Sequence, residues 1–127
     1  MAAAYLNAFV LFADFDGRTS RAGYWGFLAV HAAVSAVLVV ASAVVGEVAG
    51  LAWVVGGAVA ALYLAVTFFP VLSATARRLH DTGRSSLWVA LALLPPLALL
   101  LAVWLAQPGE PAPNGWGQPP GAGVEGR

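Results

Sequence analysis

Three long stretches without a charged residue constrain what this chain can fold into more than any other feature. No Asp, Glu, Lys or Arg occurs between Arg21 and Glu47, between Glu47 and Arg77, or between Arg84 and Glu110. A helix needs about 20 apolar residues to cross the roughly 30 Å hydrocarbon core of a bilayer, and each stretch is longer than that. The sequence therefore predicts membrane-spanning helices over residues 24–45, 51–72 and 87–106.

The composition supports lipid as the solvent of these segments. The chain is 61% hydrophobic and only 9% charged, whereas soluble domains carry about 25% charged residues. The alternative, a buried helical hairpin of a soluble protein, is disfavoured because helices that are apolar all round leave no polar face for water. We therefore predict an all-α membrane protein with one membrane domain over residues 1–106.

Net charge and cysteine content narrow the function classes. The formal net charge is zero, which argues against a general nucleic-acid binder. The chain has no Cys, so disulfides, thiolate metal sites and cysteine nucleophiles are excluded. The segment from Met1 to Ala13 lacks the basic start of a secretory signal peptide, so we expect no cleavage there.

Aromatic residues support the ends of the predicted spans, because Trp and Tyr favour the headgroup level of a bilayer. Tyr24 and Trp25 open the first span, and Trp53 lies near the start of the second. Trp88 and Trp104 bracket the third span. We interpret all five side chains as membrane-interface aromatics.

The arginines predict the orientation. The loop between the first two spans carries Glu47 and no basic residue. The basic residues gather before the first span, at Arg18 and Arg21, and between the second and third spans, at Arg77, Arg78 and Arg84. Cytoplasmic loops of membrane proteins are enriched in Arg and Lys. We therefore expect the amino terminus and the 77–84 segment on the cytoplasmic side.

The pair Pro95-Pro96 interrupts the third predicted span. Proline lacks an amide donor and clashes with the preceding turn, so the pair must kink or break the helix. We expect a kinked crossing over residues 87–106, because irregular backbone in contact with lipid is costly. The crossing places the tail outside. In the alternative, residues 87–94 and 97–106 form a re-entrant hairpin that returns the tail to the cytoplasm.

The two ends of the chain have different compositions. Tyr5, Leu6, Phe9 and Val10 are spaced to give one apolar face of a short interfacial helix, with frayed coil as the alternative. Residues 107–127 are rich in Pro and Gly and have few side chains that could form a core. We expect this segment to be a flexible, disordered tail.

The remaining polar residues form two short stretches, 15–25 and 77–85. Gly17 favours a turn, and Thr19 or Ser20 can cap the helix that follows. Gly83 suits the left-handed residue after a helix end. Asp81 lies at the right helical spacing to pair with Arg77 or Arg78.

These stretches carry a resemblance to a known family. The chain resembles the bacterial inner-membrane family named domain of unknown function 805 from about Phe9 to Gly117. The first signature matches Gly17, Arg18, Arg21, Tyr24 and Trp25, and the second matches Arg77, Arg78, Leu79, His80, Asp81, Gly83, Arg84 and Ser85. Pro108-Gly109, Asn114 and Trp116-Gly117 resemble a degraded form of the family's ending. Gly23 and Leu87 depart from the pattern. The resemblance implies a multi-pass inner-membrane protein and supplies no activity.

Guanidinium groups at one interface can form paired hydrogen bonds to phosphates of the negatively charged cytoplasmic leaflet. We therefore predict that the arginine face engages an anionic headgroup or a partner protein, and the alternative is that the arginines only fix topology and helix ends. The residues in this prediction are Arg18, Arg21, Arg77, Arg78, His80, Asp81 and Arg84.

Catalysis and transport are weaker interpretations. His80 and Asp81 are adjacent, so on a helix their side chains point about 100° apart and do not form a catalytic pair. The other histidine, His31, lies within the first span, so we expect no metal site, no cofactor and no enzyme activity. The rival function is an oligomeric small transporter or channel subunit. Small residues at four-residue spacing, such as Gly57, Ala61 and Ala65, suit either a homo-oligomer or packing within one bundle.

Overall fold

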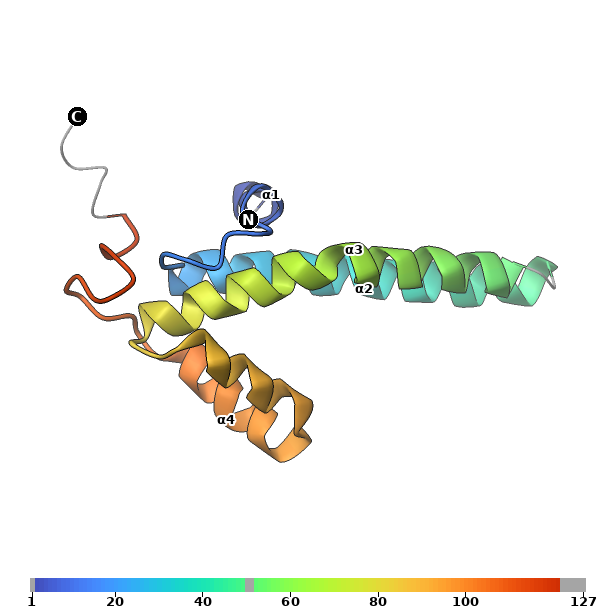
Figure 1. Ribbon diagram of the computed structural model, residues 1–127. Coiled ribbons are helices and arrows are strands. Elements are labelled where there is room, and N and C mark those ends of the chain that lie inside the picture. Colours follow the sequence, from blue (N-terminus) through green and yellow to red (C-terminus); the bar gives the residue numbers. More distant parts are fainter. Residues whose placement is uncertain (1, 50–51, 122–127) are drawn as a thin grey trace.

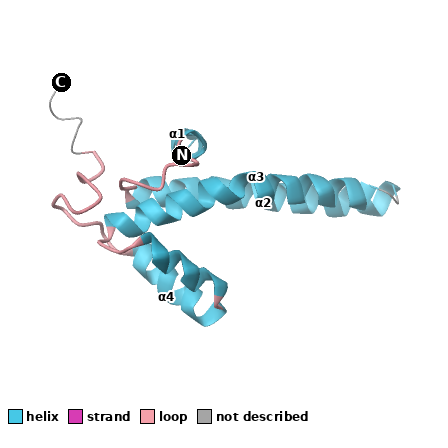
Figure 2. Ribbon diagram, in the orientation of Figure 1, coloured by secondary structure: helices cyan, strands magenta, loops and turns pink. Residues whose placement is uncertain are grey.

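The computed structural model describes residues 2–49 and 52–121, and all of its regular secondary structure in these residues is helical. The elements are α1 (Ala2–Val10), α2 (Arg21–Ala49), α3 (Ala52–Asp81), the 3₁₀ helix η1 (Ser86–Leu93) and α4 (Pro95–Ala106). Within the described residues there is no β-strand, only an isolated bridge between Asn114 and Gly117 (Figure 2). The predicted all-helical class is confirmed.

Helices α2 and α3 form one long antiparallel hairpin (Figure 1). They have 29 and 30 residues, which corresponds to about 45 Å at 1.5 Å per residue. A Cβ atom built on Gly56 would lie 2.7 Å from the Ser42 side chain, so the two backbones approach closely there. The segments Arg21–Val45 and Val54–Asp81 are long and apolar enough to cross a bilayer. The first two predicted spans therefore have matching helices.

The third predicted span has a different structure. Leu94 is extended (φ −116°, ψ 106°) and separates η1 from α4, whose first residue is Pro95. A residue before proline is disfavoured in the helical region, and proline suits the first position of a new helix. The rings of Trp88 and Trp104 meet at 5.5 Å, so the two arms lie side by side in opposite directions. The expected single kinked crossing over 87–106 is not confirmed, because the chain turns back at Leu94.

Helix α1 packs across the long hairpin, and Figure 1 shows it end-on while α2 and α3 run sideways. Its Tyr5 hydroxyl lies 3.0 Å from the Tyr63 hydroxyl of α3. Ala8 is buried, and Phe9 is partly buried. Leu6 and Val10 are exposed instead, so the predicted apolar face is divided between the protein and its surroundings.

Burial is concentrated at one end of the hairpin. Every residue of α3 from Ser73 to Asp81 is buried, including four that are charged or titratable. At the other end the side chains are apolar and exposed: Val37 of α2 and Leu62 of α3 each keep 66% of their surface. The core of the protein is therefore the last part of α3, where α1, the start of α2, α4 and the tail converge.

Candidate functional site

The candidate site is built on the last two turns of α3. Gly83 has φ of +74° and ends the helix. Its amide donates to His80 O at 3.1 Å, and the Arg84 amide donates to Leu79 O at 2.9 Å. This is the Schellman pattern predicted from the glycine, and it satisfies carbonyls that a helix end otherwise leaves free.

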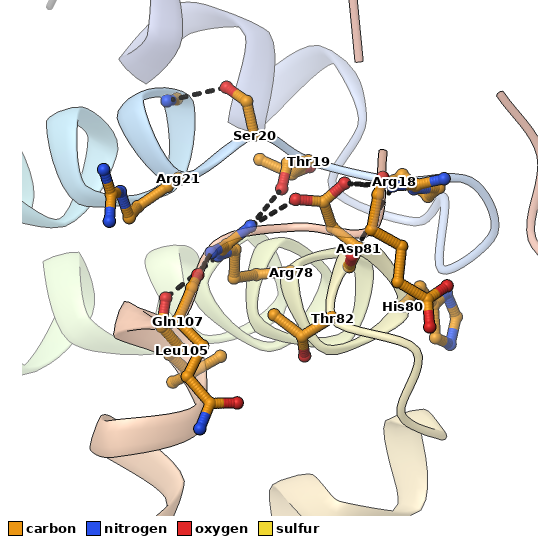
Figure 3. Close-up of polar contacts among 12 residues, drawn as sticks. Arg18, Thr19, Ser20, Arg21, Arg78, His80, Asp81, Thr82, Leu105 and Gln107 are labelled. Carbon is orange, nitrogen blue, oxygen red and sulfur yellow. Dashed lines mark hydrogen bonds and ion pairs between the residues drawn. The ribbon is translucent and has the colours of Figure 1, made fainter. Parts of the chain in front are cut away.

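Asp81 is the centre of a buried ion-pair network (Figure 3). Its Oδ1 lies 2.9 Å from Nη2 of Arg18, and its Oδ2 accepts from Nη1 of Arg78. The side chains of Arg18, Arg78 and Asp81 are 1%, 0% and 4% exposed. We call these three residues, together with Arg77, the arginine cluster. The predicted pairing of Asp81 with a neighbouring arginine is therefore with Arg78, and Arg18 joins from 63 residues away.

Arg78 connects three parts of the chain (Figure 3). Nε donates to Leu105 O at 2.9 Å, and Nη2 donates to Gln107 O. Nη1 also lies 3.5 Å from Thr19 O, just before α2. The carbonyls of Leu105 and Gln107 belong to the end of α4, where a cation is favoured by the helix dipole and by the unpaired carbonyl groups.

Arg18 holds the segment after α4. Nη1 donates to Ala112 O at 2.8 Å, and Nη2 donates to Glu110 O. The Glu110 amide in turn donates to Asp81 O at 2.8 Å. A Cβ atom on Gly109 would collide with the Asp81 carboxylate, so only glycine fits this approach. We expected a flexible tail from residue 107, whereas the structure packs residues 107–117 onto the arginine cluster.

His80 is enclosed by backbone and by an indole. Its Nδ1 lies 3.1 Å from Gly17 O, and its ring stacks on Trp116 at 4.5 Å with an interplanar angle of 10°. Asn114 Nδ2 donates to the His80 carbonyl at 2.9 Å. The carboxylate of the adjacent Asp81 is committed to two arginines. His80 therefore joins the loop before α2 to the tail.

Arg77 forms hydrogen bonds with the loop that joins α1 to α2. Nε donates to Thr19 Oγ1 at 3.2 Å, and Nη1 donates to Leu11 O at 2.8 Å and to Asp14 O. The residue is 4% exposed. Its hydrogen-bond acceptors in the described chain are all neutral oxygens, which distinguishes it from Arg18 and Arg78.

The other two predicted arginines lie outside the cluster, and each contacts a residue near the end of α4. Arg21 is exposed, and its Nη1 lies 3.4 Å from Ala106 O. Arg84 is partly exposed, and its guanidinium lies 4.8 Å from the centre of the Trp104 ring. The structure therefore separates the predicted set into a buried cluster and two accessible arginines.

The predicted interface aromatics also divide. Trp25 and Trp88 are exposed, and the Trp25 indole donates to Leu105 O at 3.3 Å. Tyr24 is buried, with its hydroxyl 3.4 Å from Thr75 Oγ1, so it belongs to the core. The side chain of Trp53 lies outside the described residues.

Sequence reasoning missed the acceptors of this site, because most are backbone carbonyls. Leu11, Thr19, Leu105, Gln107 and Ala112 all contribute a main-chain oxygen. The available signal was the Pro108-Gly109, Asn114 and Trp116-Gly117 pattern, whose members contact Asp81 and His80. In the described ranges no group of three or more His, Cys, Asp and Glu could hold a metal ion.

Comparisons with known proteins agree on one family. The family model described as protein of unknown function (DUF805) matches residues 12–118. The chain is 36% identical to inner membrane protein YhaI of Escherichia coli strain K12, over 91% of this chain and 93% of that protein. It is 33% identical to inner membrane protein YhaH of the same strain, over 91% and 94% of the two chains. No solved structure matches this chain.

Proposed function

The chain belongs to the DUF805 family, and from that premise we propose that it is a non-enzymatic inner-membrane protein that engages anionic lipid at its arginine-rich end. Two of its relatives are named inner membrane proteins, and two of its helices are long and apolar enough to span a bilayer. The observation that carries the proposal is the placement of Arg21 and Arg84 among tryptophans at the end of α4.

The topology that supports this function has two crossings. Helices α2 and α3 cross the bilayer, and the short η1–α4 hairpin enters and leaves on one side. Helix α4 has 12 residues, which gives about 18 Å and is too short for the roughly 30 Å hydrocarbon core. Because α4 ends against Arg78, the tail shares the side of the segment before α2. The arginine bias makes this the cytoplasmic side.

The accessible arginines are suited to lipid headgroups. Arg84 lies over Trp104, and Trp104 touches Trp88, which joins a cation to two interfacial indoles. Arg21 and the exposed Trp25 both reach carbonyls at the end of α4. Tryptophan marks the headgroup level, and guanidinium forms paired hydrogen bonds with phosphate oxygens.

The buried arginines have a different role in this proposal. Arg18 and Arg78 are saturated by Asp81 and by carbonyls from the tail and α4. They assemble the end of the protein and thereby position Arg21 and Arg84. Of the residues predicted from the sequence to contact a headgroup, we therefore propose that only Arg21 and Arg84 do so.

Lipid retention tests the proposal. The protein is purified in mild detergent with phosphatidylglycerol or phosphatidylcholine, and bound lipid is counted by native mass spectrometry. Wild type should retain phosphatidylglycerol selectively, and the double variant Arg21→Gln, Arg84→Gln should lose this selectivity. A basic residue near an anionic surface contributes about 1 kcal/mol, or roughly fivefold in affinity.

The matched control keeps both charges. The double variant Arg21→Lys, Arg84→Lys should retain most of the selectivity, because lysine still attracts phosphate as a point charge. Equal retention of both lipids by the wild-type protein would contradict the proposal.

A further inference from the structure

Charge does not balance inside the arginine cluster. The buried side chains of Arg18, Arg77 and Arg78 bring three guanidinium groups, and among the residues whose burial the structure describes Asp81 is the one buried carboxylate. Arginine keeps its proton in proteins, so each of the three remains a cation. A buried cation without a counter-charge is costly. The cluster therefore has a deficit of negative charge.

Arg77 is the cation without an ion pair. Among the described residues no carboxylate oxygen lies within 4.0 Å of it, whereas Arg18 and Arg78 share Asp81. Asp14, on the facing loop, contributes its carbonyl to Arg77. Its carboxylate accepts from the Asp16 amide at 3.0 Å and acts on Arg77 only as a more distant charge, which offsets part of the cost of burial. No hydrogen bond from the described chain reaches Nη2 of Arg77.

A cavity lies beside this guanidinium. It has a volume of about 380 Å³ and lies between α1, the start of α2 and the end of α3, within the range of about 300–1,000 Å³ that small-molecule sites have. Its lining combines polar residues, such as Asn7, Thr19, Ser20 and Arg77, with apolar residues, such as Ala8 and Phe27. No fully buried side-chain nitrogen in the described chain lacks a hydrogen-bond partner, so Nη2 is not fully buried, and Arg77 is one of the residues that line this cavity.

The start of α2 adds positive potential to the same cavity. Ser20 Oγ accepts from the Gly23 amide at 3.1 Å, and Ser20 O accepts from the Tyr24 amide at 2.9 Å. Ser20 and Gly23 both line the cavity. The first amides of a helix have no partner within it, and the dipole of this 29-residue helix favours an anion at this end.

We propose that this cavity binds a phosphate group, which supplies the negative charge missing beside Arg77. The polar lining residues offer guanidinium, hydroxyl and amide donors, and the apolar lining residues suit an attached hydrocarbon part. The phosphate comes either from a membrane phospholipid or from the cytoplasm as a free anion. The site is separate from the lipid contact proposed at Arg21 and Arg84, so each can fail without the other.

Asn7 gives a test that leaves the cluster intact. Its side chain is exposed on α1, lines the cavity and makes no hydrogen bond in the described chain. The variants are Asn7→Asp and Asn7→Lys, with Asn7→Ser as the uncharged control. Binding of inorganic phosphate is measured by calorimetry on detergent-solubilised protein, and binding of phosphatidylglycerol by native mass spectrometry from nanodiscs.

We expect Asn7→Asp to weaken binding about fivefold and Asn7→Lys to strengthen it about fivefold, because a unit charge is placed at the cavity wall. Asn7→Ser should match the wild type.

This ranking of affinities with inorganic phosphate supports a soluble source, and the same ranking with phosphatidylglycerol alone supports a lipid source. Lack of binding by both probes, or the same affinity in all four proteins, overturns the proposal. Arg21→Gln, Arg84→Gln should preserve the ranking, which separates this site from the proposed function.

Discussion

The two halves of α3 have opposite surroundings although they belong to one continuous helix. The first half exposes Leu62, Leu64 and Val66, and the second half encloses Arg78 and Leu79 completely near its end. In a soluble protein this distribution would be reversed. The comparison shows that the apolar half is suited to lipid, while the charged half needs hydrogen-bond and ion-pair partners from other segments of the chain.

The halves also differ in what holds them. Lipid gives apolar helices no hydrophobic driving force for association, so the first half depends on close packing such as that of Gly56 on Ser42. The second half depends on ion pairs and on hydrogen bonds from arginines to carbonyls. Substitutions at the charged end should therefore cost more stability than substitutions at the apolar end.

The largest expected effect comes from removing the buried carboxylate. Asp81→Ala leaves Arg18 and Arg78 without their counter-charge, and breaking a buried pair in this way costs about 3–5 kcal/mol. The free energy of unfolding in detergent micelles measures the loss. The control is Asp16→Ala, an exposed carboxylate that should change little. Equal losses in the two variants would show that the charged end is not a core.

The next effect comes from Arg78→Lys, which keeps the charge and removes the planar fork. Lysine cannot reach Leu105 O, Gln107 O and Asp81 together, and each hydrogen bond to a charged group contributes about 1.5–3 kcal/mol. We expect a loss of about 2 kcal/mol in the same unfolding measurement. Arg84→Lys, outside the cluster, should lose clearly less. If the two substitutions cost the same, the fork geometry has no role.

A third substitution separates the tail from the cluster. The Cβ atom of Gly109→Ala would collide with the Asp81 carboxylate, whereas the Cβ atom of Gly115→Ala would meet nothing within 4 Å. Overpacking a filled site costs about 1–3 kcal/mol, so only the first variant should release residues 107–117. The rate at which a protease cleaves the tail measures this release. Comparable protection in both variants would mean that the tail does not dock as described.

The smallest effect is expected in the apolar half. Replacing a helical glycine with alanine gains up to about 1 kcal/mol in helix propensity. Gly57→Ala should gain this amount because its Cβ atom enters open space, and Gly56→Ala should lose stability because its Cβ atom meets Ser42. Thermal unfolding of both variants in one detergent compares them. A gain in both would show that α2 and α3 are not in close contact there.

Much of the apolar half could be predicted from sequence, because lipid exposure needs only length and the absence of charge. The intervals from Arg21 to Glu47 and from Glu47 to Arg77 were sufficient for α2 and for most of α3. At the charged end, helical spacing correctly placed Asp81 beside a neighbouring arginine. It could not find Arg18, because that contact depends on how separate elements pack.

The structure differs from two of the expectations, and each difference has a physical reason. The reversal at Leu94 was disfavoured as irregular backbone in lipid, but the Leu94 amide donates to Leu91 O at 3.2 Å and the Leu94 carbonyl accepts from the Leu97 and Ala98 amides, so the main-chain groups at the turn are paired. The tail was expected to be free because it has few core side chains, yet it attaches through carbonyls, such as those of Glu110 and Ala112. Amino-acid composition describes side chains only, so it cannot predict hydrogen bonds to main-chain carbonyls.

The central claim is that one membrane face gathers the start of α2, the end of α3, the end of α4 and the tail. The most direct test is a pair of reporters fused after Arg127: a protein that fluoresces only in the cytoplasm, and a phosphatase that is active only outside it. A fusion truncated after Ala49, at the far end of α2, is the control and should show phosphatase activity. We predict a fluorescent and phosphatase-inactive fusion at Arg127. A dark fusion with active phosphatase there would contradict the account.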